Sequence, residues 1–155
     1  MEQETLDMLT QTLGQAITEV CGMMLGETVT VGSPEAAEGL AHRAGAGVRG
    51  SIDISGDLAG EASIHLPTET AVNLVSAFVG AETRPDDESF ADAIGELANM
   101  VVGSAKAHFE GLNCSISCPT VSLVAQSGDG SRLPDLCLPV TGQSGDFAIE
   151  VLLAA

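Results

Sequence analysis

The chain has 155 residues, of which 22 are acidic and 5 are lysine or arginine, so its formal net charge at pH 7 is -17. This charge repels the phosphates of nucleic acids and anionic membrane surfaces, and no apolar run approaches the roughly 20 residues of a membrane span. The acidic start, Met1–Glu4, is unlike a signal peptide. We therefore expect a single cytoplasmic domain, residues 1–155, that binds neither nucleic acid nor membrane.

The first half of the chain predicts a helix, several strands and a second helix. Apolar residues recur at helical spacing from about residue 4 to 25, and this amphipathic helix should end near Gly26. The segments that follow are a short strand at 28–31, a loop rich in glycine and alanine at 33–47, and two strands at 48–55 and 61–66. Thr68 can then cap the second helix.

The second half predicts one long helix followed by four strands. The helix should start within the acidic segment 86–89, where Ser89 and Asp92 resemble a capping box, and run to about Glu110. The predicted strands are at 114–118, 121–125, 136–141 and 147–153. We expect an α+β fold, in which an antiparallel β-sheet packs against long α-helices.

The two halves show a faint internal repeat. Residues 13–18 of the first helix can be aligned with residues 94–99 of the long helix. The aligned polar pairs are Gln15 with Glu96 and Thr18 with Asn99. The alignment is short and chance is the alternative, but a real repeat predicts pseudo-repeated helix-plus-strands halves.

The most informative segment is the pattern Asp-x3-Glu-x2-Asn within the long helix. Asp92, Glu96 and Asn99 follow i, i+4, i+7 spacing and so share one helix face. The opposite face carries the apolar residues Phe90, Ile94, Leu97 and Val101. The polar face is flanked by the small residues Gly95, Ala98 and Gly103. Such a face can admit a partner closely and hold a water molecule.

Two further features accompany this motif: Pro119 lies downstream at the end of a predicted strand, and a strand–turn–strand surrounds residues 55–60. Together with the motif, they make the chain resemble the CheC/CheX family of chemotaxis phosphatases. A single motif is closer to CheX than to CheC, which typically carries two. The resemblance implies a CheC-like fold, a homodimer, and removal of the phosphoryl group from the aspartyl phosphate of a CheY-like response regulator. It also implies that Asn99 directs the attacking water and that Glu96 pairs with the regulator's active-site lysine.

By the same resemblance, Mg²⁺ belongs to the response regulator and the chain needs no cofactor of its own. The chemistry is consistent with this, because an amide can orient a water molecule without repelling a phosphoryl group. Asp92 lies in the first turns of the helix and has only a supporting role, with the helix dipole as a plainer explanation.

Other interpretations of the same face stay open. A glutamate and an asparagine on an exposed helix face are often only solvated. The domain can also be a non-catalytic docking module for a receiver domain or a flagellar-switch protein. A third alternative is a structural dimer with a vestigial face.

Overall fold

The computed structural model describes residues 2–34, 47–124 and 134–154. The helical elements are α1 (Glu2–Val20), a π-helical turn (Cys21–Leu25), α3 (Thr68–Val79) and α4 (Glu88–Lys106). The strands are β1 (Thr30–Val31), β2 (Gly47–Gly56), β3 (Gly60–Pro67), β4 (Cys114–Ile116), β5 (Thr120–Val124), β6 (Leu136–Gly142) and β7 (Gly145–Leu153).

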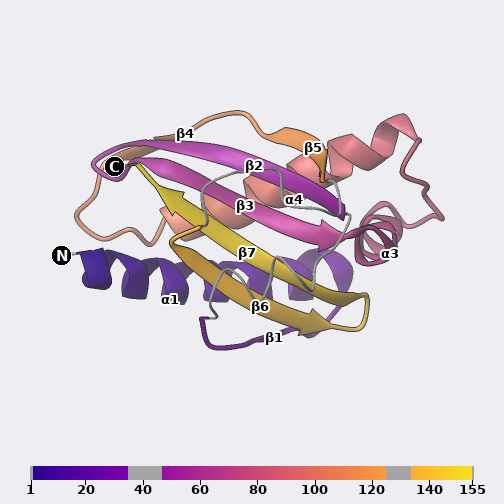
Figure 1. The fold of residues 1–155 in the computed structure, drawn as a ribbon. Helices are drawn as coiled ribbons and strands as arrows, with labels where there is room; N and C mark the ends of the chain where they lie inside the picture. The colour runs from indigo at the N-terminus through magenta and orange to yellow at the C-terminus, as the bar shows by residue number, and fades with distance from the viewer. Residues whose placement is uncertain (1, 35–46, 125–133, 155) are drawn as a thin grey trace.

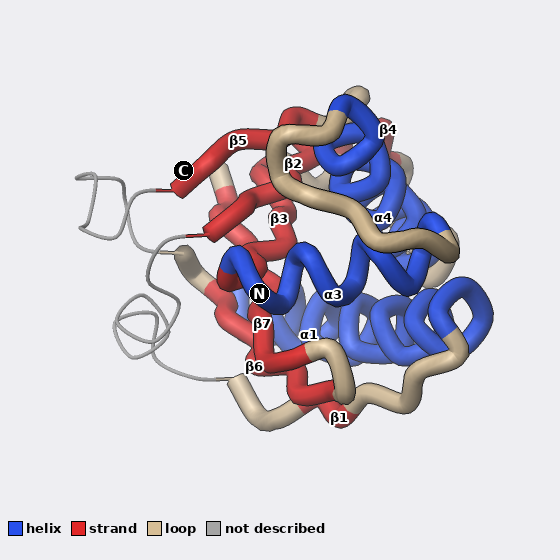
Figure 2. Tube along the Cα trace, turned by 90° about the vertical axis from the view of Figure 1, so that its right-hand side faces the viewer, coloured by secondary structure: helices blue, strands red, loops and turns tan. Residues whose placement is uncertain are grey.

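The strands of the described residues form one antiparallel sheet, and the helices lie against one of its faces (Figures 1 and 2). The strand order is β1-β6-β7-β3-β2-β4, and β5 pairs with residues 47–51 of β2, next to the residues 54–56 that pair with β4. Helices α1 and α4 pack against each other beneath the sheet, and α3 covers the end of the sheet where β3 finishes. The expected α+β fold with antiparallel strands and long helices is confirmed.

The alternation of side chains along the strands explains this arrangement. On β2, Val48, Ile52 and Ile54 are buried, whereas Asp53 and Ser55 between and after them are exposed. Because successive side chains of a strand point to opposite faces, one face of the sheet is apolar and packs on the amphipathic helices. The core therefore lies between the sheet and the pair formed by α1 and α4.

The topology contains the repeated halves expected from the sequence. The first half contains α1, β1 and the hairpin β2-β3, and the second contains α4, β5 and the hairpin β6-β7, with β4 as an additional short strand between α4 and β5. The short strands are exchanged between the halves, because β1 pairs with β6 and β5 pairs with β2. The two hairpins meet at the centre of the sheet, where β3 pairs with β7.

Several predicted boundaries and caps are wrong. The strands predicted at 28–31 and 114–118 are shorter, covering Thr30–Val31 and Cys114–Ile116. Helix α4 ends at Lys106, because the chain tightens there into turns such as the Phe109 N–H to Lys106 C=O bond, which place the Phe109 side chain in the core. The capping box does not form, since Ser89 is already inside the helix and Asp87 is its N-cap residue. Likewise, Thr68 is the first residue of α3 and makes no side-chain cap.

Some predictions fall outside the described residues, namely most of the loop at 33–47 and the end of the strand at 121–125. In the part of the chain that the structure describes, no helix has the length and apolar character needed to cross a membrane.

Candidate functional site

Helix α4 is anchored by its apolar stripe. Phe90, Ile94, Leu97 and Val101 are each at most 3% exposed. These side chains belong to the core between the sheet and the helices. At this interface, Ile94 Cγ2 and Ala98 Cβ lie close to Gly50 of β2. This confirms the prediction that one face of the helix is buried. The packing of these side chains also holds the opposite face of α4 in a fixed orientation.

The opposite face presents the polar residues of the motif. Asp92 and Glu96 are exposed, and Asn99 is half-buried. Within residues 2–34, 47–124 and 134–154, none of these three side chains has a hydrogen bond or an ion pair. Their polar groups are therefore open to an external partner.

The small residues of the motif do not flank an open face as expected. Gly95 and Ala98 are buried, and they allow the helix to approach other parts of the chain. A Cβ atom placed on Gly95 would lie 3.2 Å from Pro119 Cγ and 3.5 Å from Val121 Cγ2. Gly95 thus accommodates the connection between β4 and β5, and the prediction that it admits a partner is wrong.

The site has a negative local charge. Asp92 and Glu96 are one helical turn apart, and the sole lysine of the chain, Lys106, is ten residues beyond Glu96. This separation is about 15 Å along the helix axis, which exceeds the screening length of roughly 8 Å at physiological salt. The exposed face is therefore suited to a cationic group on a partner.

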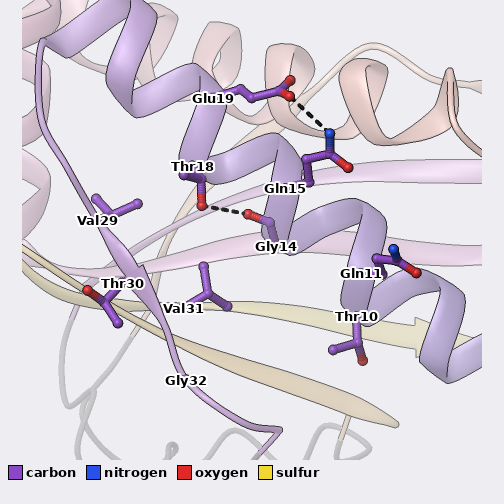
Figure 3. A pocket seen from close by; sticks show the side chains of 10 residues that line it. All are labelled: Thr10, Gln11, Gly14, Gln15, Thr18, Glu19, Val29, Thr30, Val31 and Gly32. Carbon is purple, nitrogen blue, oxygen red and sulfur yellow. Dashed lines mark hydrogen bonds between the residues drawn. The ribbon is translucent and has the colours of Figure 1, made fainter.

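The corresponding face of α1 is organised differently (Figure 3). There, Gln15 Nε2 donates a hydrogen bond of 3.1 Å to Glu19 Oε1, and Thr18 Oγ1 donates one of 2.8 Å to the Gly14 carbonyl. A groove of about 690 Å³ separates this face from β1. At the aligned positions, Gln15 and Thr18 of α1 have hydrogen-bond partners, whereas Glu96 and Asn99 of α4 have none in the described residues.

The repeat alignment is supported by packing. Gly14 lies beside Val31 of β1 in the way that Gly95 lies beside Val121 of β5, with Cβ positions 3.6 Å and 3.5 Å from the valine Cγ atoms. Equivalent glycines thus face equivalent edge strands in the two halves. At the aligned positions the second half has Glu96 and Asn99, whereas the first half has Gln15 and Thr18.

The structure offers no sign of thiol chemistry at the buried cysteines. Burial, reinforced by Glu27, raises the pKa of the Cys21 thiol to about 11. Burial and Glu150, partly opposed by Arg49, raise the pKa of the Cys137 thiol to about 12. A thiolate is the nucleophilic form of cysteine, so neither residue is a nucleophile at neutral pH. In the described part of the chain, no group of three His, Cys, Asp or Glu side chains is placed to hold a metal ion.

Sequence reasoning missed the role of the connection between β4 and β5. The predicted strand at 114–118 includes Ser117 and Cys118, yet β4 ends at Ile116, and Pro119 of the connection lies beside Gly95 of α4. The sequence signal is the proline itself, because a residue without an N–H interrupts a strand ladder.

Comparison with known proteins agrees with this fold. The CheX structure from Desulfovibrio desulfuricans has a TM-score of 0.76 and 22% identity, covering 94% of this chain and 99% of that chain. The CheX structure from Vibrio vulnificus has a TM-score of 0.78 and 21% identity, covering 92% of this chain and 97% of that chain. The CheX-CheY-BeF3-Mg²⁺ complex from Borrelia burgdorferi has a TM-score of 0.72 and 18% identity, covering 94% and 97% respectively.

These identities lie below 25%, so the structural likeness shows the fold alone. A search of curated protein sequences found no significant match. The family model described as chemotaxis phosphatase CheX matches residues 48–128, which is 81 of the 155 residues and includes all of α4. The chain therefore belongs to the CheX family of chemotaxis phosphatases.

Proposed function

We propose that the protein removes the phosphoryl group from the aspartyl phosphate of a CheY-like receiver domain. The observation that carries the proposal is the contrast between the two repeated helices. On α4, Glu96 and Asn99 face outward without intramolecular partners in the described residues, whereas Gln15 and Thr18 on α1 are already hydrogen-bonded. A pair kept available on a rigid helix suits an active site that is completed by the partner.

In this proposal, each residue of the motif has a separate role. The Asn99 amide accepts a hydrogen bond from water and donates one toward the phosphoryl oxygens, which aligns the water with the scissile P–O bond. The Glu96 carboxylate binds the receiver's active-site lysine, a charge-assisted contact that fixes the docking geometry. Asp92 supports this by adding negative charge one turn earlier on the helix.

The receiver contributes the remaining groups. Its Mg²⁺ ion and lysine neutralise the phosphoryl oxygens, so positioning of the water is the help left for a phosphatase to provide. This protein then needs no nucleophile, cofactor or metal ion of its own. The Borrelia burgdorferi relative, whose structure is described as a complex of CheX with CheY, BeF3 and Mg²⁺, supports a CheY-like receiver as the partner class.

The second candidate function is docking without catalysis. The negative face favours binding of a cationic surface whether or not chemistry follows, so a receiver or a flagellar-switch protein can be bound without loss of phosphate. The test mixes the protein with a phosphorylated receiver and follows phosphate release and complex formation together. Faster phosphate release at substoichiometric protein supports the phosphatase. A stable complex with an unchanged rate of release contradicts it and supports the docking module.

We further propose, from family membership, that two copies form a homodimer and that the protein acts in the cytoplasm, where receiver domains are phosphorylated. Neither statement is needed for the chemistry of a single α4 face.

A further inference from the structure

The connection between β4 and β5 contains one residue more than the segment of β2 that it faces. The pairs on its two sides are Ile54 with Ile116 and Ser51 with Thr120. Residues 117–119 therefore lie opposite residues 52–53, three against two, which is a β-bulge. The extra residue reverses the alternation of side chains, so that Val121 faces α4 after the bulge, as Ile116 does before it.

Pro119 of the bulge and Ile116 before it form a wall beside the stripe of α4 that contains Gly95, Asn99 and Gly103. Pro119 Cγ lies 3.2 Å from a Cβ placed on Gly95, and Ile116 Cδ1 lies 3.9 Å from one placed on Gly103. Asn99 is four residues from each glycine on the same stripe of the helix, between these two contacts. It is half-buried there, whereas Glu96 is exposed.

Ser117 fixes this wall to the sheet. Its N–H donates a 2.9 Å hydrogen bond to the Asp53 carbonyl, and its Oγ accepts a 2.9 Å bond from the Asp53 N–H. The same hydroxyl donates a 3.0 Å bond to the Cys118 carbonyl. The side chain of Ser117 thus replaces a backbone acceptor where the bulge interrupts the ladder.

We propose that Ser117 is a positioning residue for Asn99. By holding the bulge against α4, it limits the directions in which the Asn99 amide can turn and from which water can reach that amide. This inference rests on the proposed phosphatase function. Loss of the hydroxyl should lower turnover rather than docking, because Glu96 is exposed and is not on the stripe that faces the wall.

The test measures kcat and KM for phosphate release from a phosphorylated receiver, using the full chain. Ser117→Ala removes the acceptor, and we expect kcat to fall by about tenfold with KM within about twofold of wild type. Ser117→Thr keeps a hydroxyl at an exposed position and should restore most of kcat. In NMR spectra, the side-chain amide signals of Asn99, assigned by their loss in Asn99→Ala, should shift in Ser117→Ala and return in Ser117→Thr.

The outcomes separate the inference from the proposed function. A Ser117→Ala variant with wild-type kcat and unmoved Asn99 signals overturns the inference while wild type and Asn99→Ala still test the phosphatase. A Ser117→Thr variant as impaired as Ser117→Ala also overturns it, because the hydroxyl then plays no part. A wild-type protein that does not accelerate phosphate release overturns the proposed function and the inference with it.

Discussion

At the residue scale, Glu96 and Asn99 have different surroundings although they are three positions apart. Glu96 is exposed, while Asn99 is half-buried and lies one turn from Gly95, which packs against Pro119 of the bulge. The difference suits their proposed roles, since a docking carboxylate must reach a partner and an orienting amide must be held still.

We predict that Glu96→Gln weakens docking and rate together. The change keeps the shape of the side chain and removes the charge that binds the receiver's lysine, so affinity should fall by about fivefold. Surface plasmon resonance with a phosphorylated or analogue-bound receiver measures this. The wild-type advantage should shrink as salt is raised, because screening weakens exposed ion pairs.

Glu19→Gln is the matched control for this prediction. It makes the same change in charge on the equivalent face of α1, where Glu19 accepts a hydrogen bond from Gln15. We expect little change in docking. Equal losses in the two variants would show that overall charge, rather than the α4 face, governs binding.

The sequence predicted that Asp92, Glu96 and Asn99 share the helix face opposite the buried stripe, because helical spacing decides this. It could not predict that Gly95 and Ala98 are buried. Small side chains give no hydrophobic signal of their own, and the close approach of β2 and Pro119 comes from segments distant in the sequence.

At the scale of elements, α4 and the bulge are fitted to each other through Gly95. Replacing this glycine by alanine adds helix propensity worth up to about 1 kcal/mol. It also places a methyl group 3.2 Å from Pro119 Cγ, which requires the bulge to move or the packing to be strained.

We therefore predict that Gly95→Ala is less stable than the matched variant Gly14→Ala. In α1 the added Cβ meets only Val31 Cγ1, at an ordinary 3.6 Å, so Gly14→Ala should stabilise the protein by about 0.5–1 kcal/mol. Gly95→Ala should fall about 1 kcal/mol or more below it in urea unfolding. Equal stabilisation by both substitutions would mean that Pro119 yields freely and the bulge is not tightly packed.

Element types and most boundaries followed from local patterns, but strand partners did not. The alternation on β2 shows which side chains are buried, and it carries no information on which strand lies beside it. The exchange of β1 and β5 between the halves and the extra residue at 117–119 are set by pairing between distant segments. The end of α4 at Lys106 likewise depends on the core position of Phe109.

At the scale of the whole molecule, the acid and amide of the α4 face have no equivalent at the aligned positions of α1, which are Gln15 and Thr18. The two halves share their topology, but of the aligned positions only those of α4, Glu96 and Asn99, are an acid and an amide, and neither has a partner in the described residues. One chain should therefore act on one receiver at a time.

We predict a homodimer in solution, on the basis of the CheX family. Light scattering coupled to gel filtration should give twice the mass of one chain. If Glu96 and Asn99 lie outside the dimer interface, a dimer should bind two receivers, one for each α4. A monomer at micromolar concentration would contradict the prediction without affecting the chemistry proposed for α4.

The central claim is that the Asn99 amide orients the attacking water, and phosphate release by Asn99→Ala tests it most directly. The matched control is Thr18→Ala, which truncates the aligned position of α1. We predict that Asn99→Ala lowers the accelerated rate by about a hundredfold or more, toward the receiver's intrinsic rate, while binding is largely kept and Thr18→Ala stays near wild type. An Asn99→Ala protein that releases phosphate as fast as wild type would contradict the account.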